Sequence, residues 1–494
     1  MKKILCLLPE LAGLAWSIAL VLSVSALLVS PLSAQIGRRF PSEKKIVIDP
    51  ITGVPLTFLT STQGTGDSKI YQTHHQWTSD GKWVIFRSSR AGSGQAMAVN
   101  EETGDIVQVS ESGFQGMLCI AEHSMTLYFL RSQALPGAAV EAPFPPPPAA
   151  AAGRGDGPAN TRGGRGGRGG GGVGGRGGPR GPAQVIAVDL AKLFADSAAG
   201  RLKAASEYEH VRGTLPTEMG APGDMALDPT ENFAYIRVGS VEAAKHLPPD
   251  AKIEKSFGPR GMGAGPTGLV SMNLRTGETK FILAVPFQIG HVQTNPWNPG
   301  EIVFCWETGG KAPQRTWTVM SDGTGLRPLY PEAPYEWVTH EAVISRDEVV
   351  IALLAFSGEG VWDGAGTAEH PTGVGIVNLR TREMRIVGQV PVGDPGRSDW
   401  HVNGSSDGRW AVCDDFRYRL WLIDRHSGEM AIIADLGQKT TAQDHTHPTF
   451  NADSTKIEIQ TAMLSEDNRS LNICVVPVPR SWLARTYDNP KIGP

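Results

Sequence analysis

The chain has few cysteines for its length and almost no excess of charge of either sign. Among 494 residues there are 5 cysteines, and the formal net charge is −4. The cysteines that follow the N-terminal segment lie in apolar runs without zinc-type spacing, so we expect buried free thiols and no disulfide framework. These are Cys119, Cys305, Cys413 and Cys474. The near-neutral balance gives no general reason to expect nucleic acid or an anionic membrane surface as a partner.

Long apolar runs are also scarce, and the one that occurs lies at the N-terminus. Lys2 and Lys3 precede an uncharged run from Leu11 to Ala34, which ends in the small residues Ser33 and Ala34. This pattern predicts an export signal over residues 1–34 and a mature, periplasmic or extracellular protein over residues 35–494. The run is long enough to span a bilayer, so an uncleaved anchor in the inner membrane is the alternative.

Turn residues, by contrast, are abundant and recur in a repeated pattern. The chain holds 59 glycines and 36 prolines, and its clearest repeats read THHQWTSDGKWVIFRSS, WHVNGSSDGRWAVCDDF and THPTFNADSTKIEIQTA. Seven such units of short apolar runs, separated by turn signals, predict an all-β fold, a seven-bladed β-propeller. The strand–turn–strand at Lys45–Ser61 precedes the first unit, and we expect it to pair into the last blade and close the ring.

One segment cannot belong to a packed core. Residues 136–182 are rich in proline, arginine and glycine and fall between the strand pairs of the second unit. Such a composition predicts a disordered loop. An inert spacer is the first interpretation, and contact with an anionic polymer, or with nucleic acid, is the alternative.

Four histidines occupy the same place in their repeats. Each stands six residues before the turn residue that follows it, in the pairs His74–Asp80, His340–Arg346, His401–Asp407 and His447–Asp453. In a propeller this register places the four side chains at a similar height around the central channel. Scattered core histidines would not keep step with the repeat.

Converging imidazoles suit a metal, a general base, or both. His445 lies two residues before His447, and Gln443 two before His445, so on an extended chain these side chains share a face. Nitrogen-rich ligation fits zinc, iron, nickel or manganese. Histidines that only hydrogen-bond along a wet channel remain the alternative at this point.

Several segments together resemble the oligogalacturonate lyases, a family of seven-bladed propellers in pectin breakdown. The resemblance rests on DPITGVPLTFLT, GHVQTNPWNPGEIVFCWE, QRTW, THE, DWHVNGSSDG and HTHPTF, in that order. It runs from about Lys45 to the end of the chain and implies an enzyme that cleaves short oligogalacturonides by β-elimination with manganese, or another divalent metal, as cofactor.

The resemblance also implies roles for individual residues. His340 of THE matches the catalytic base, and Arg315 of QRTW matches a residue that contacts the acidic group of the substrate. The metal ligands are matched by His401, His445, His447 and Gln443. Because His74 shares the register of the others, we assign it to substrate binding. We expect His340 to lie across the channel from the metal ligands, within reach of the substrate only.

Two differences from the family accompany these assignments. Thr446 stands where the family has proline between the paired histidines, and Gln443 is two residues before His445, where the family's glutamine is three before. The alternative function is a non-catalytic periplasmic propeller of the TolB type, whose turns resemble SDGKW and SDGRW and which binds a protein or peptide. The one match to G-x-S-x-G, GSSDG at residues 404–408, belongs to a repeat turn and not to a strand-to-helix elbow, which argues against a serine hydrolase.

We predict that deleting residues 136–182 leaves the protein folded, because that composition cannot bury a core. The deletion variant should keep the melting temperature and metal content of the full chain. A large loss in either quantity would make the segment part of the fold.

Overall fold

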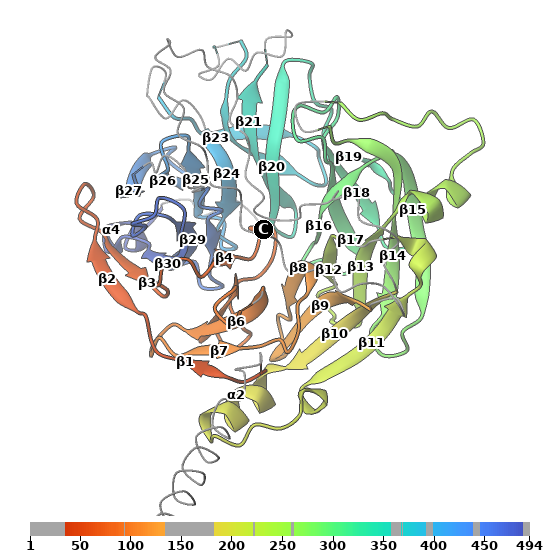
Figure 1. Cartoon of the computed structure of the whole chain (residues 1–494). Helices are drawn as coiled ribbons and strands as arrows, with labels where there is room; N and C mark the ends of the chain where they lie inside the picture. Colours follow the sequence, from red (N-terminus) through yellow and green to blue (C-terminus); the bar gives the residue numbers. More distant parts are fainter. Residues whose placement is uncertain are drawn as a thin grey trace, which may run out of the picture.

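The computed structural model shows a ring of seven antiparallel sheets around a common centre (Figure 1). It describes residues 35–92, 94–133, 182–220, 223–257, 261–356, 367, 369–391, 399–437 and 445–487. The all-β, seven-bladed prediction is therefore confirmed. Within these residues, no helix is both long and apolar enough to cross a membrane. The expected signal at residues 1–34 and Gln443 lie outside the described residues.

Each blade is built from consecutive strands, beginning with the strand nearest the centre. Blade 1 contains β4 (Ser68–Lys69), β5 (Trp83–Ser88), β6 (Gln95–Asn100) and β7 (Ile106–Gln108), with β1 (Arg39–Phe40) added outside. Blade 2 contains β8 (Gln115–Ile120), β9 (Thr126–Ser132), β10 (Ala183–Asp189) and β11 (Glu209–Leu215). Blade 3 contains β12 (Met225–Leu227), β13 (Phe233–Val238), β14 (Ala264–Asn273) and β15 (Thr279–Phe287).

The next three blades follow the same order. Blade 4 contains β16 (Ile289–Thr294), β17 (Glu301–Trp306), β18 (Thr316–Met320) and β19 (Arg327–Pro328). Blade 5 contains β20 (Glu336–Ser345), β21 (Glu348–Ala355), β22 (Gly373–Asn378) and β23 (Met384–Gly388). Blade 6 contains β24 (Asp399–Gly404), β25 (Trp410–Asp415), β26 (Arg419–Asp424) and β27 (Met430–Asp435).

The two ends of the chain share blade 7, as predicted. Its inner strands are β28 (Thr449–Phe450), β29 (Lys456–Thr461) and β30 (Asn472–Pro477), and its outer strands are β3 (Pro55–Phe58) and β2 (Lys45–Ile48). Thr57 pairs with Val475, and Phe58 pairs with Cys474. The ring is thereby closed by hydrogen bonds between its first and last parts, and an edge that would otherwise stay unpaired is covered.

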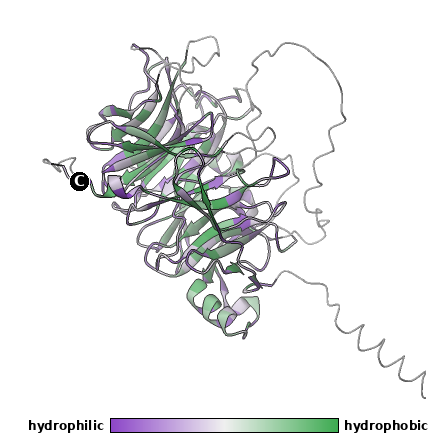
Figure 2. Ribbon diagram, turned by 90° about the vertical axis from the view of Figure 1, so that its left-hand side faces the viewer, coloured by the Kyte–Doolittle hydropathy of each residue, from purple (hydrophilic) through white to green (hydrophobic). Residues whose placement is uncertain are grey.

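Apolar side chains fill the layers between adjacent blades, while the polar residues gather in the connecting loops (Figure 2). This follows from the alternation of the strands, because successive side chains point to opposite faces and each face meets a neighbouring blade. Cys119, Cys305, Cys413 and Cys474 are buried and free, which confirms the expectation from the sequence.

Helices are few among the described residues and lie outside the sheets. They are α2 (Leu190–Ala198), α3 (Ser240–Ala243) and α4 (Arg480–Leu483). The side chain of Asp189 accepts a hydrogen bond from the backbone of Lys192 and so caps α2. The predicted loop joins β9 to β10, whose ends pair directly as Ser132 and Ala183. Residues 134–181 lie outside the described part of the chain.

We predict that Phe58→Ala strongly destabilises the ring. The Phe58 side chain is fully buried where the two ends of the chain meet, and such a truncation typically costs about 3–5 kcal/mol. Ile46→Ala on β2 is the control, because Ile46 is 66% exposed. Thermal unfolding followed by circular dichroism should show a clear loss for Phe58→Ala only; equal melting temperatures would mean that the closure contributes little.

Candidate active site

The innermost strands of three consecutive blades are interrupted at a histidine or directly before one. The pairing register shifts between Gly290 and Gln293 in β16, between Val338 and His340 in β20, and between Asp399 and Val402 in β24. A β-bulge inserts an extra residue and redirects a side chain that a regular strand would aim elsewhere. The bulges thus contain His291 and His401, and in β20 the inserted residue is Thr339, directly before His340.

The imidazole rings of blades 5, 6 and 7 meet one another. The ring centroid of His401 lies 4.1 Å from that of His340, 4.0 Å from that of His447 and 5.1 Å from that of His445. His401 and His447 are buried. The structure therefore brings together four of the histidines that the sequence singled out.

Tyr71, which precedes the first turn of blade 1, lies among these rings. Its centroid is 4.8 Å from that of His291 and 5.2 Å from that of His447. It is 6.5 Å from the centroids of both His340 and His401. Burial raises the pKa of the Tyr71 hydroxyl well above its ordinary value, so the phenol keeps its proton.

His340 does not lie across the ring from the expected ligands, and that prediction was wrong. Blades 5 and 6 are neighbours, and the bulges in β20 and β24 turn His340 and His401 toward each other. The Nδ1 atom of His340 lies 2.6 Å from the carbonyl oxygen of Trp400, to which it donates. The Nε2 atom of a neutral imidazole held in this way keeps its lone pair.

The environment of His340 favours that neutral form. Burial is the largest cause that lowers its pKa well below the ordinary value, followed by the charges of His401 and Arg315. Both causes act in one direction, because burial disfavours a charged ring and nearby cations repel it. His340 is therefore an imidazole that can accept a proton at Nε2.

Asp414 on β25 holds His401 in place. One carboxylate oxygen accepts from the backbone N–H of His401 at 2.7 Å, and the other lies 3.2 Å from Nδ1 of the same residue. The second oxygen also accepts from the backbone and the hydroxyl of Thr446, at 2.9 and 3.0 Å. A carboxylate bound to Nδ1 directs Nε2 toward a metal, as in many metalloproteins.

The donor set fits a divalent metal in part. One ligand atom each from His401, Asp414 and His445 lies within 4.8 Å of the others. Because the oxygens of Asp414 already accept from His401 and Thr446, we interpret Asp414 as the residue that orients His401. His401 and His445 are then the two imidazoles best arranged to coordinate an ion.

His447 lies beside His401, but its Nδ1 atom is engaged by Gln460. The amide nitrogen of Gln460 lies 3.0 Å from this atom and 2.9 Å from the carbonyl oxygen of His445, while its amide oxygen accepts from the backbone of Lys69 at 3.1 Å. These contacts fix the amide with its N–H toward His447, so a neutral His447 carries its proton on Nε2. Ligation by His447 stays a prediction, and it requires a rearrangement at Gln460.

His74 takes no part in the ring contacts of the cluster. Its Nε2 atom lies 2.9 Å from the carbonyl oxygen of Met225, and its Nδ1 atom 2.8 Å from the hydroxyl of Thr73. Both ring nitrogens are thus used within the protein. A role in substrate binding stays a prediction.

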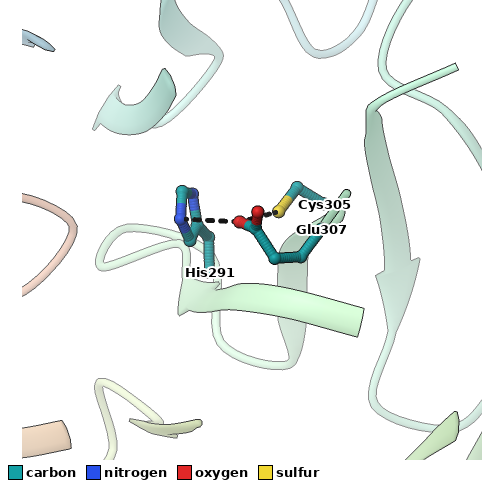
Figure 3. A group of neighbouring side chains, drawn as sticks. All are labelled: His291, Cys305 and Glu307. Carbon is teal, nitrogen blue, oxygen red and sulfur yellow. Dashed lines mark hydrogen bonds and ion pairs between the residues drawn. The ribbon is translucent and has the colours of Figure 1, made fainter. Parts of the chain in front are cut away.

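Arg315 belongs to a second group of side chains, on blades 4 and 5. Its Nε atom lies 3.2 Å from Glu341, and its Nη2 atom 3.5 Å from Glu307. His291 lies between the same two carboxylates, with Nδ1 2.7 Å from Glu341. Its Nε2 atom lies 3.2 Å from Glu307, the contact drawn in Figure 3. The guanidinium that we expected to meet the substrate is therefore already paired, through Nε and Nη2.

This second group is poorly suited to a metal, although His291, Cys305 and Glu307 each place a ligand atom within 4.8 Å of the others. Burial raises the pKa of the Cys305 thiol well above its ordinary value, so the thiolate that binds metals does not form readily. Arg315 would also repel a cation at this position. We interpret the group as a network of two cations and two carboxylates.

Sequence reasoning missed His291, although the same register contains it. His291 stands six residues before Trp297, just as the other four histidines stand six before their turn residues. Its turn has tryptophan where the other repeats have aspartate or arginine, so a search for histidines six residues before such a turn residue does not find it. Its partners Glu307 and Glu341 come from other strands, and a single sequence does not show that they meet.

Comparison with known proteins finds similarity to oligogalacturonate lyases both in sequence and in structure. No family model matches the chain. An oligogalacturonate lyase of Dickeya dadantii (strain 3937) is 23% identical over 209 residues, which are 38% of this chain and 50% of that protein. A solved oligogalacturonate lyase in complex with manganese has a TM-score of 0.64 at 16% identity and covers 91% of this chain and 99% of its own.

A second solved structure, the oligogalacturonate lyase of Vibrio parahaemolyticus, has a TM-score of 0.63 at 16% identity and covers 91% of this chain and 100% of its own. The chain resembles the oligogalacturonate lyases. The match to the Dickeya protein spans about half the length of that relative. At these identities the solved structures establish the common fold.

We predict that Asp414 controls the affinity of the site for a divalent metal. Asp414→Asn should weaken manganese binding about 10- to 100-fold, as losses of such orienting groups typically do. His401→Ala should abolish it, and Asp322→Asn, at an exposed turn, is the control. Titration calorimetry on folded variants measures the affinities; unchanged binding by His401→Ala would remove the metal from this place.

Proposed function

We propose that this protein is a lyase that cleaves short oligogalacturonides, the fragments of pectin, by β-elimination at a uronate. The proposal rests on the cluster of histidines at the centre of the ring and on the similarity to oligogalacturonate lyases in sequence and fold. The substrate is the one that the names of those relatives indicate.

The observation that carries the proposal is the state of His340. Its Nδ1–H is fixed on the Trp400 carbonyl, and its ring is partly buried beside His401. The Nε2 atom is then a base that is neutral near pH 7 and is aimed from the inner strand of blade 5. A base positioned in this way contributes about a hundred- to ten-thousand-fold to a proton transfer.

His401 and His445 would hold the metal. His447 would join them once the amide of Gln460 has rearranged and no longer donates to its Nδ1 atom. Gln443 is the fourth candidate from the sequence. When bound there, a divalent ion such as the manganese of the solved relative would act as a Lewis acid toward the carboxylate of the uronate. His401 is prepared for this by Asp414, which fixes its ring.

The residues of the chain support each change in the substrate. His340 takes the proton from C5, and negative charge develops on the neighbouring carboxylate. Arg315 is buried, and its charge is close enough to lower the pKa of His340. Its contacts with Glu341 and Glu307 are made through Nε and Nη2, so we assign Nη1 to a carboxylate of the substrate. A fixed cation near the developing charge lowers the barrier. The C4–O4 bond then breaks, which leaves a 4,5-unsaturated uronate without the addition of water.

We further propose that the protein acts outside the cytoplasm, as the N-terminal sequence predicts, with an inner-membrane tether as the alternative form. An exported enzyme meets pectin fragments before they are imported. Fractionation of cells that express the full chain, with detection of the mature N-terminus, tests both forms.

We predict that His340→Ala abolishes elimination without loss of metal. Purified protein with manganese and oligogalacturonides should generate the ultraviolet absorbance of the unsaturated product, and His340→Ala should reduce the rate at least about a hundred-fold. His123→Ala, at an exposed histidine of blade 2, is the matched control. Normal turnover by His340→Ala would show that another residue is the base.

A further inference from the structure

His291 is partly buried at the centre of the ring, with 16% of its side chain exposed, and has no part in the reaction as described above. It occupies the same repeat register as His447, and both residues have a positive φ, of 50° and 48°. The left-handed region is uncommon for residues other than glycine and is typical of functional positions. The bulge in β16 also falls at His291. A positive φ and a β-bulge together thus set the orientation of the His291 ring.

The contacts of His291 favour a proton on both ring nitrogens. Nδ1 lies 2.7 Å from a carboxylate oxygen of Glu341, and Nε2 lies 3.2 Å from one of Glu307. An ionised carboxylate only accepts hydrogen bonds, so Nδ1 donates to Glu341, and the ion pair with Glu307 favours a proton on Nε2 as well. Nη2 of Arg315 also lies 3.4 Å from Nδ1, at a longer distance than Glu341. The ring is then an imidazolium, and its charge and that of Arg315 are balanced by the two glutamates.

The pKa values of His291 and His340 are shifted in opposite directions. Burial by itself would lower the pKa of His291, but the charges of Glu341 and Glu307 outweigh it and raise that pKa, against a smaller effect of Arg315. The pKa of His340 is lowered by burial and by nearby cations. The ring centroids are 6.1 Å apart, and the planes differ by 16°. Groups whose environments separate their pKa values in this way typically divide the roles of acid and base.

We propose that His291 is the general acid of the reaction and protonates O4 of the leaving sugar, an inference that rests on the proposed function. The C5–H electron pair becomes the second bond between C4 and C5, while the proton moves to Nε2 of His340. The C4–O4 pair leaves with O4, which takes the Nε2 proton of His291. His340 ends as an imidazolium and His291 as a neutral ring, and proton exchange with solvent restores both.

The structure also indicates which nitrogen releases its proton. Nδ1 is held by the shorter bond, to Glu341, whose side chain is fully buried. Nε2 faces Glu307 at the longer distance, and the Glu307 side chain is 15% exposed. The neutral ring left after the transfer keeps Nδ1–H on Glu341. Tyr71 is the other phenol or imidazole donor close to this position, and it provides the competing assignment.

The test varies the leaving group. Manganese-loaded protein is given an oligogalacturonide, whose leaving sugar needs a proton, and a uronate that carries a 4-nitrophenoxy group at C4, which needs none. His291→Asn retains an N–H donor for Glu341 and removes the titratable proton. We expect it to lose about a hundred-fold or more on the oligogalacturonide and less than about ten-fold on the activated substrate. His340→Ala should be slow on both, and His123→Asn normal on both.

The dependence of kcat/KM on pH is a second measurement, and it would not change if the role of His291 were only structural. Since a raised pKa keeps His291 protonated, kcat/KM should fall as the pH rises through that pKa. Glu307→Gln removes one of the two carboxylates and should move this basic limb to lower pH. The charged and titratable groups that face His291 are Glu341, Glu307, Arg315, Cys305, Tyr71 and His340.

The outcomes are distinct. Equal losses by His291→Asn on the two substrates, or a basic limb that stays in place in Glu307→Gln, would overturn the assignment of the acid. So would a leaving-group-dependent loss in Tyr71→Phe that His291→Asn lacks. Absence of elimination by the wild-type protein on both substrates would overturn the proposed function and this inference together.

Discussion

The bulge in the innermost strand of a blade is the feature on which the site depends. In blades 4 and 6 it contains His291 and His401, and in blade 5 it falls at Thr339, directly before His340. A regular strand would alternate side chains between the two neighbouring blades at these places. An extra residue at each of these places turns a side chain out of the inter-blade layer. The apolar layers can then remain continuous while the polar groups gather at the centre. The ring closure by β3 and β30 supports this arrangement by fixing blade 7, and with it His447, against blade 1.

The charged groups at the centre are organised so that similar residues have different chemical states. The imidazoles and Arg315 around His340 lower its pKa and favour the neutral ring, whereas the two carboxylates around His291 raise its pKa and favour the protonated ring. His401 differs from both, because Asp414 binds its Nδ1 atom and leaves Nε2 as the atom that can coordinate a metal. Environment rather than residue type decides the role of each ring.

The sequence was sufficient for the architecture and for much of the site. Repeated turns gave seven blades, and the six-residue register identified His340, His401 and His447, because spacing along a repeat translates directly into position around a ring. The register could not reveal the bulges, which depend on pairing between strands. For that reason the position of His340 was wrong, and the pairing of Arg315 with Glu307 and Glu341 was not foreseen. His291 was missed because its turn departs from the pattern at Trp297.

The central claim is that the converging histidines carry out an elimination. Mass spectrometry of the products of a defined oligogalacturonide tests it most directly, since elimination adds no atoms while hydrolysis adds water across the broken bond. We predict fragments whose masses add up to that of the substrate, one of them carrying the unsaturated uronate. Fragments that together exceed the substrate by the mass of one water molecule would contradict the account.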